Sequence, residues 1–209
     1  MNTLFYASGA SSLSAHILLE KSRLPYTVTP VNLDPHTTSL GDYHQLNPKN
    51  YVPALQTESG DFMTECAVIL EYISHQSPLP LMADYATEQY WQQRMWLNYI
   101  TTELHKNFIS PFRKGNWLPN TPESQDLVRS RVFPRLAYIE KALAGQSFLV
   151  ANQFSAPDAY LFVMTNWCRR LAFSLTDFPN LDRFDQHMRQ DPAMQSVLKQ
   201  EGKPHSSKA

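Results

Sequence analysis

The fold is decided by residues 47–65, which read NPKNYVPALQTESGDFMTE. A turn at the start of this stretch leads past Val52-Pro53 into a short apolar strand. Glu58-Ser59-Gly60-Asp61 is typical of a tight turn, and the apolar residues after it predict a second, antiparallel strand. Thr64-Glu65 then opens a helix of mostly apolar character. This stretch therefore predicts a β-hairpin followed by a helix.

The residues before the hairpin predict a βαβ unit. Thr3–Tyr6 is short, apolar and aromatic, as in a buried strand. Apolar residues recur at helical spacing from Ser12 to Lys21, and Tyr26–Val31 forms a second strand. Two strands joined by a helix pair in parallel through a right-handed crossover. Residues 1–77 are thus expected to form an α/β domain with the order βαβ-ββα.

The second half of the chain predicts an all-helical domain at residues 87–209. A proline-rich break, Ser77-Pro78-Leu79-Pro80, marks a linker at residues 78–86. Beyond it the sequence contains no convincing strand pattern. Thr121-Pro122 and Ser155-Ala156-Pro157 each have the N-cap and early proline of a helix start. The expected helices span 87–112, 121–143, 155–171, 184–188 and 192–200.

Composition excludes several classes of protein. The 209 residues include 18 basic and 19 acidic side chains, without a long run of one sign, so neither nucleic acid nor an anionic membrane is an expected partner. The chain shows neither a secretory signal nor about 20 successive apolar residues that could span a bilayer. Cys66 and Cys168 form no metal-binding spacing and no disulfide framework. A cytoplasmic protein without a metal is expected.

Three local features could carry chemistry. A cis proline at Val52-Pro53 would turn the Val52 backbone outward as an edge for an extended peptide, whereas a trans proline would only start a strand. The helix start at Thr64-Glu65-Cys66 suits an α-amino-acid head group, since its N–H groups attract a carboxylate and Glu65 can accept from an ammonium. Alternatively, Glu65 only complements the helix dipole.

The third feature is the turn Gly9-Ala10-Ser11-Ser12-Leu13-Ser14 between the first strand and the first helix. Small residues there let a ligand approach the backbone, and a hydroxyl can donate to an anion. The alternative is that one of these serines only caps the helix.

Taken in order, several segments resemble the glutathione transferase family, most closely its bacterial beta class. The matching segments are Gly9–His16, Asn47-Pro48-Lys49, Val52-Pro53, Thr64-Glu65, Trp96–Tyr99, Glu103–Lys106 and Ser155–Phe162. The last of these resembles the family's internal capping box, in which Ser155 caps a helix and Asp158 bonds back to the Ser155 backbone. The resemblance implies a thioredoxin-like N-terminal domain, an all-helical C-terminal domain, a homodimer, and glutathione as co-substrate.

The resemblance also implies a set of site residues. Val52, next to cis Pro53, would pair with the cysteinyl backbone of glutathione. Glu65 and Cys66 would hold the γ-glutamyl group, and Asn98 would reach the ligand of the partner subunit. The predicted catalytic residues are Ser11 and His105. The predicted glutathione-binding residues are Ser11, His36, Lys49, Tyr51, Val52, Pro53, Glu65, Cys66, Asn98 and Lys106. The predicted pocket for the second substrate contains Phe108, Phe112, Trp117 and Trp167, for which core packing is the alternative.

The sequence departs from the beta class at three positions. Ser11 stands where the class commonly carries a cysteine. A serine cannot form a disulfide, but its hydroxyl can donate to a thiolate and lower the thiol pKa from about 8.5. Ser12 is the rival donor and Tyr6 a weaker one. Cys66 replaces a usual serine. In Asp34-Pro35-His36 the class often carries a lysine that faces the glycyl carboxylate, and here His36 would substitute for it in part.

The leading prediction is an enzyme of detoxification that adds the glutathione thiolate to a small, largely apolar electrophile. Two alternatives remain open at this point. One is a non-catalytic member of the superfamily that binds a ligand or a protein. The other is a glutathione-dependent reductase that acts through a different thiol, for which Cys168 is the candidate.

Overall fold

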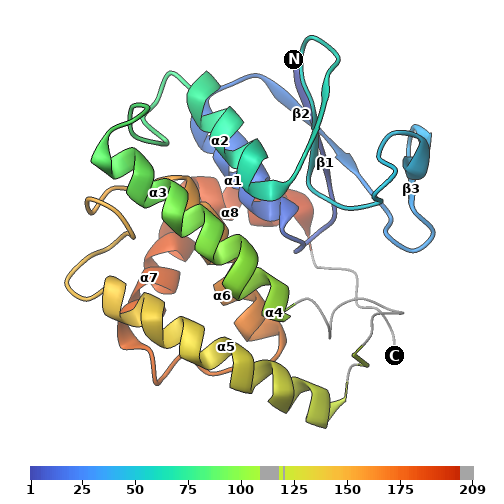
Figure 1. Ribbon diagram of the computed structural model, residues 1–209. Helices are drawn as coiled ribbons and strands as arrows, with labels where there is room; N and C mark the ends of the chain where they lie inside the picture. The colour runs from blue at the N-terminus through green and yellow to red at the C-terminus, as the bar shows by residue number, and fades with distance from the viewer. Residues whose placement is uncertain (109–117, 120, 203–209) are drawn as a thin grey trace.

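The structure is a computed structural model that describes residues 1–108, 118–119 and 121–202. An α/β part and a helical part lie side by side (Figure 1). A four-stranded sheet has the order β2-β1-β5-β6, in which β1 pairs in parallel with β2 and antiparallel with β5. The strands are β1 (Asn2–Tyr6), β2 (Tyr26–Pro30), β5 (Ala54–Gln56) and β6 (Phe62–Thr64). The predicted βαβ unit and β-hairpin are both confirmed.

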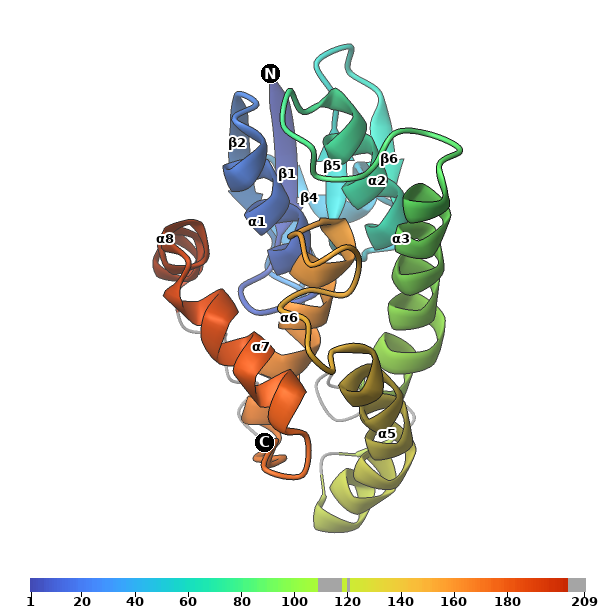
Figure 2. The same cartoon turned by 90° about the vertical axis from the view of Figure 1, so that its left-hand side faces the viewer.

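The two faces of this sheet are covered differently. Helices α1 (Ser12–Ser22) and α2 (Cys66–Gln76) pack on one face, where Leu4 of β1 joins the main core (Figure 2). Successive side chains of a strand point to opposite faces. Phe5 therefore lies on the other face, where it packs with Val31 and Tyr43 in a smaller buried cluster.

A small element precedes β5. The polar stretch at residues 34–45, for which the sequence predicts no element, contains a two-stranded sheet and a short 3₁₀ helix. These are β3 (Thr37–Thr38), β4 (Gly41–Asp42) and η1 (Tyr43–Gln45). Strands of two polar residues have no apolar alternation, so the pattern rules cannot detect them.

After residue 80 the described residues contain no strand, so the predicted α/β plus all-α fold class is confirmed. The helices are α3 (Glu88–Tyr99), the π-helix η2 (Ile100–His105), α4 (Lys106–Phe108), α5 (Pro122–Ala142), α6 (Ala156–Arg170), α7 (Pro179–Gln190) and α8 (Pro192–Glu201). The single helix expected at 87–112 is thus divided by a π-helical turn, and its last residues lie outside the described ranges. The helix expected at 184–188 begins earlier, because Pro179 occupies its first turn.

Helix α6 is the centre of the helical part, with twelve buried residues. Its predicted capping box is present: the Asp158 carboxylate accepts from the Ser155 N–H and hydroxyl, each at 2.9 Å. It also accepts from the Leu149 N–H at 2.9 Å, and Asp158 is fully buried. One carboxylate therefore joins the start of α6 to the loop that precedes it.

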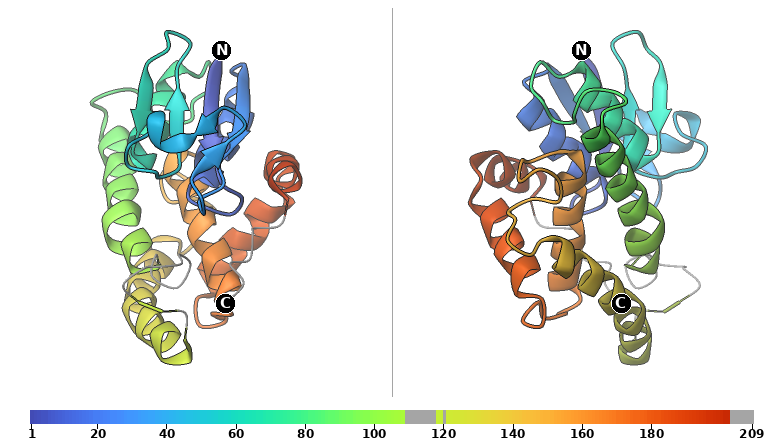
Figure 3. Two further views of the ribbon diagram at one scale, coloured as in Figure 1. Left: turned by 90° about the vertical axis from the view of Figure 1, so that its right-hand side faces the viewer. Right: turned by 60° about the vertical axis from the view of Figure 1, so that its left-hand side comes forward.

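Helices α3 and α6 reach the α/β part, whereas α5 extends away from it (Figure 3). Helix α1 packs against α6 and α8 as well as α2, so it carries much of the contact between the two parts. In the described ranges, none of the helices is both long enough and apolar enough to cross a membrane.

Candidate functional site

The Val52-Pro53 peptide bond is cis, as the sequence analysis anticipated from context. A buried side chain stabilises the turn before this peptide bond: Asn47 donates through Nδ2 to the Tyr51 carbonyl at 2.8 Å. The Tyr43 hydroxyl donates to the same carbonyl at 2.8 Å. The side chain of Tyr51 remains exposed.

The two candidate serines have different surroundings. The Ser11 hydroxyl donates to the Val52 carbonyl at 3.2 Å, which links the first turn to the cis-proline strand. Ser12 is fully buried, and its hydroxyl both accepts from the Ala7 N–H at 3.1 Å and donates to the Ala7 carbonyl at 3.2 Å. Ser12 therefore uses both of its hydrogen-bonding functions within the turn. Tyr6 packs its ring against His16, and burial raises its pKa.

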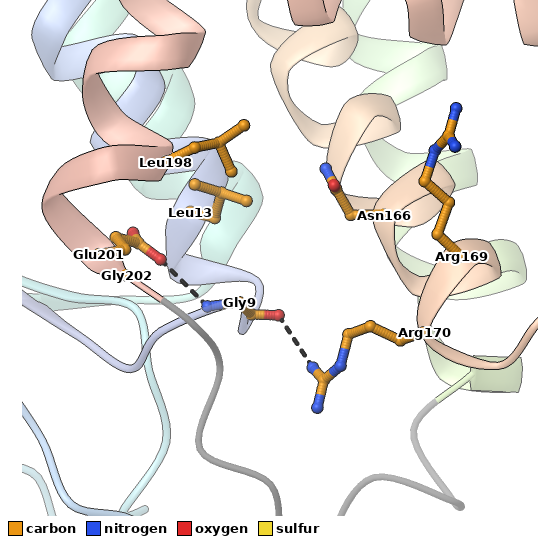
Figure 4. Close-up of a pocket in the computed structure, with 8 residues that line it drawn as sticks. All are labelled: Gly9, Leu13, Asn166, Arg169, Arg170, Leu198, Glu201 and Gly202. Atoms are coloured by element: carbon orange, nitrogen blue, oxygen red, sulfur yellow. Dashed lines mark hydrogen bonds between the residues drawn. The ribbon is translucent and has the colours of Figure 1, made fainter.

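Gly9, in the same turn, is held by the helical part. Its N–H donates to Glu201 Oε2 at 3.1 Å, and its carbonyl accepts from Trp167 Nε1 at 2.9 Å and from Arg170 Nη1 at 3.3 Å. Figure 4 shows Glu201 and Arg170 on either side of Gly9. A cavity of about 300 Å³ adjoins them between α1, α6 and α8. Among the described residues, none assigned to glutathione by the resemblance lines this cavity.

Glu201 also reaches into the α/β part. Its second oxygen, Oε1, lies 3.0 Å from Nδ1 of His16, and both side chains are almost completely buried. The hydroxyl of Ser8 donates to the Gly202 carbonyl at 3.1 Å. The end of α8 is thus bound to the turn that carries Ser11. The sequence contains no local signal for this contact, since Glu201 follows a predicted helix in a polar stretch.

The start of α2 places Glu65 beside Lys49. Glu65 has a φ of 71°, and its side chain makes no capping hydrogen bond to α2. Instead, Lys49 Nζ donates to Glu65 Oε1 at 2.7 Å and to Thr64 Oγ1 at 3.0 Å. The hydrogen bond from Lys49 holds the pKa of Glu65 below its ordinary value, and the charge of Lys106 acts in the same direction. Glu65 is therefore ionised at neutral pH.

The Cys66 thiol is turned inward. It lies 3.2 Å from Ser14 Oγ and donates to the Ser11 carbonyl at 3.7 Å. Burial raises the pKa of the Cys66 thiol to about 12, so it is protonated at neutral pH. The Cys66 side chain thus makes its contacts inside the protein. The group that Cys66 can offer a ligand at the start of α2 is its backbone N–H.

His105 is the last residue of the π-helix η2. Its Nδ1 pairs with the Tyr160 hydroxyl, and its ring packs edge-on against Trp167 at a centroid distance of 4.9 Å. Burial lowers the pKa of His105 to about 4, with a further contribution from Lys106. The imidazole is therefore neutral at pH 7. The sequence does not indicate the contact with Tyr160, because the spacing of Tyr160 fits the core of α6.

The predicted second-substrate residues lie inside the protein where they are described. Phe108 is fully buried, Trp167 is 5% exposed, and their rings pack at a centroid distance of 5.9 Å. Both are packed as the core alternative expects, and their assignment to a pocket stays a prediction. Phe112 and Trp117 lie outside the described residues.

The remaining predicted residues are less closely connected. His36 has a φ of 64°, and its carbonyl accepts from the Tyr43 N–H at 2.8 Å. Asn98 and Lys106 are exposed on the helical part. The structure thus brings Ser11 to Val52 and Lys49 to Glu65, and it places Lys106 close enough to influence Glu65.

A thioredoxin-like domain with a cis-proline edge, joined to an all-helical domain, is the architecture of the glutathione transferases. The chain belongs to the glutathione S-transferase family: the model of the family's N-terminal domain matches residues 10–76 and that of its C-terminal domain residues 93–192. It is 35% identical over 202 residues to glutathione S-transferase GstA of Escherichia coli O157:H7, which covers 95% of this chain and 98% of the relative.

Solved structures agree with this assignment. A bacterial beta class glutathione S-transferase of Sphingomonas chungbukensis superposes with a TM-score of 0.89 at 30% identity, over 96% of this chain and 98% of its own. A sphingomonad glutathione S-transferase complexed with glutathione gives a TM-score of 0.88 at 31% identity, also over 96% of this chain and 98% of its own. The chain is therefore close to the bacterial beta class.

Proposed function

We propose that this protein is a glutathione transferase that stabilises the glutathione thiolate with the Ser11 hydroxyl and adds it to a small, largely apolar electrophile. The observation that carries the proposal is the hydrogen bond of 3.2 Å from Ser11 to the Val52 carbonyl, beside the cis proline. It places a hydroxyl donor at the edge where the family resemblance locates the cysteinyl unit. Relatives named glutathione S-transferase, and one solved with glutathione, support glutathione as co-substrate.

The head group of glutathione would lie at the start of α2. There the Glu65 carboxylate would receive the α-ammonium, and the Cys66 N–H would donate to the α-carboxylate with the support of the helix dipole. His105 is neutral at pH 7 and adds a second polar group on the side of the helical part. The other residues assigned to glutathione are His36, Lys49, Tyr51, Pro53, Asn98 and Lys106.

Ser11 would change its partner when glutathione binds. In the structure its hydroxyl donates to the Val52 carbonyl. The cysteinyl N–H of glutathione is expected to take this carbonyl, so the Ser11 hydroxyl becomes available to the sulfur. A hydrogen bond to the thiolate favours the charged form, which lowers the thiol pKa and increases the nucleophile present at neutral pH.

Replacing Ser11 with alanine should slow conjugation at neutral pH by about 5–30-fold, since one hydrogen bond to a charged group is lost. Affinity for glutathione should change little. The measurement is the pH dependence of conjugation with a chromogenic electrophile, in which the apparent thiol pKa rises in the variant.

Two further variants sharpen this test. Ser11→Cys should permit a mixed disulfide, seen as the added mass of glutathione on the intact protein. Ser11→Thr, which keeps the hydroxyl, should retain more activity than Ser11→Ala. Equal activity in wild type and Ser11→Ala would remove Ser11 from the mechanism. If neither wild type nor Ser11→Ala conjugates any electrophile, the results favour the alternative of a non-catalytic binding protein.

A homodimer is expected from the exposed apolar side chains on and near α3. Trp91 is 51% exposed, Met95 54% and Tyr138 50%, although all three are large apolar or aromatic residues. Such a group of exposed side chains marks an interaction surface. Sedimentation should give twice the chain mass of 24.0 kDa at micromolar concentration. Trp91→Glu with Met95→Glu should shift the protein towards the monomer, and a wild-type monomer would contradict the proposal.

A cytoplasmic location and a role in detoxification would follow from this activity. Both are proposals that rest on the family and on the expected apolar electrophile.

A further inference from the structure

We propose that the cavity between α1, α6 and α8 is a second ligand site, which takes a small organic acid and transmits its binding to the turn that carries Ser11. The cavity has a volume of about 300 Å³, at the lower end of the range for small-molecule sites. None of its described lining residues is among those assigned to glutathione or to the second substrate. The site therefore goes beyond the proposed function, and only its effect on conjugation rests on that function.

One side of the cavity is apolar. Leu13 of α1 and Leu198 of α8 line it, and Figure 4 shows the two side chains next to each other. Across the cavity, α6 contributes the polar side chain of Asn166 and two arginines (Figure 4). An apolar surface that faces a polar one suits a ligand with an apolar body and a charged end.

The α6 side of the cavity is cationic, because Arg169 and Arg170 both line it. Arg169 donates to the buried Asp185 through Nε at 3.0 Å, and Arg189 donates to the same carboxylate through Nε at 2.8 Å. One carboxylate thus balances two guanidinium groups. This wall of the cavity keeps a positive charge, which favours an anionic ligand.

Glu201 also lines the cavity, but its carboxylate is already paired on the side of the α/β part. One oxygen accepts from the Gly9 N–H at 3.1 Å, and the other lies 3.0 Å from His16 Nδ1. The Glu201 side chain is almost completely buried. A ligand carboxylate at the α6 wall therefore lies opposite a glutamate whose oxygens both have partners.

Arg170 connects the cavity to the first turn. Its Nη1 donates to the Gly9 carbonyl at 3.3 Å, and Trp167 Nε1 donates to the same carbonyl at 2.9 Å. A carboxylate is a stronger acceptor for a guanidinium than a carbonyl is. A bound acid should therefore draw Arg170 into the cavity and weaken its hydrogen bond to Gly9. The turn is then held less firmly, two residues before Ser11, and conjugation slows.

A titration followed by ¹⁵N–¹H NMR tests the site. The probe is phenylacetate, with two controls: phenylacetamide, which has nearly the same shape without the charge, and acetate, which has the charge without the apolar body. Phenylacetate should shift the signals of Gly9 and Gly202 with a Kd of about 0.1–1 mM. Both controls should bind about tenfold more weakly.

Two variants test the role of the arginine. Arg170→Met should weaken phenylacetate by about tenfold, the effect of one hydrogen bond between charged groups. The matched control is Lys199→Met, at an exposed lysine of α8, which should change the affinity by less than about twofold. The site is overturned if phenylacetamide binds as tightly as phenylacetate, or if Arg170→Met binds phenylacetate as tightly as wild type.

Kinetics test the coupling to the first turn. Phenylacetate should slow conjugation by about 2–5-fold and then level off, because it leaves the glutathione site open. Arg170→Met should be slowed to a similar extent and should not respond further to phenylacetate. Full inhibition that glutathione relieves would place phenylacetate in the glutathione site and overturn the proposal, and an unchanged rate at saturation would overturn the coupling. A wild type that binds phenylacetate at Gly9 and Gly202 but conjugates no electrophile would support the site and overturn the proposed function.

Discussion

Replacing Asp158 with alanine is expected to lower the free energy of unfolding by about 3–5 kcal/mol, since three buried donors lose their shared acceptor and each unsatisfied donor costs about 1–3 kcal/mol. The Asp158 carboxylate is fully buried and accepts from the N–H groups of Leu149 and Ser155 and from the Ser155 hydroxyl. Alanine leaves these three donors without an acceptor inside the protein. Urea denaturation followed by far-ultraviolet circular dichroism measures the loss.

Two controls separate this effect from a general sensitivity to mutation. Asp126→Ala removes an exposed carboxylate that pairs with Arg129 on the surface of α5, and should change stability by less than about 0.5 kcal/mol. Asp158→Asn keeps one acceptor oxygen and should fall between wild type and Asp158→Ala. Equal stability of the three Asp158 proteins would show that the capping box does not hold α6 in place.

The features that the sequence predicts well are local in the chain. The capping box joins Ser155 to Asp158 three residues away, and the β5–β6 hairpin depends on one turn around Gly60. The cis state of Val52-Pro53 was inferred from its context, because the dipeptide alone favours trans. A short sequence separation leaves few possible partners, so the pattern itself identifies the contact.

The features that it did not predict depend on partners that are distant in sequence or on side-chain direction. Gly9 and Glu201 are 192 residues apart, and no periodicity connects them. The inward direction of the Cys66 thiol follows from Ser14, which the sequence suggests only as part of a small-residue turn. The pair Lys49–Glu65 requires the cis-proline turn and the start of α2 to meet, which is a property of the folded sheet.

Replacing Glu201 with alanine is expected to destabilise the protein by about 2–4 kcal/mol and also to impair the use of glutathione. Each carboxylate oxygen has a separate partner in the α/β part: the Gly9 N–H at 3.1 Å and His16 Nδ1 at 3.0 Å. The loss leaves the buried imidazole without its acceptor and releases one side of the turn that carries Ser11. KM for glutathione should therefore rise by about tenfold, since a misplaced first turn weakens orientation of the thiol.

The conservative variant Glu201→Gln separates the effect on stability from the effect on KM for glutathione. Glu201→Gln keeps an acceptor for the Gly9 N–H but removes the negative charge beside His16, so it should retain most of the affinity for glutathione while still losing stability. Glu58→Ala, at a side chain that is 84% exposed, is the matched control and should alter neither property. If Glu201→Ala lowers the unfolding free energy but leaves KM and the apparent thiol pKa unchanged, α8 stabilises the fold without positioning Ser11. A parallel loss in stability and in KM for glutathione would show that the end of α8 helps to set the geometry of the first turn, because Gly9 and Ser11 are only two residues apart.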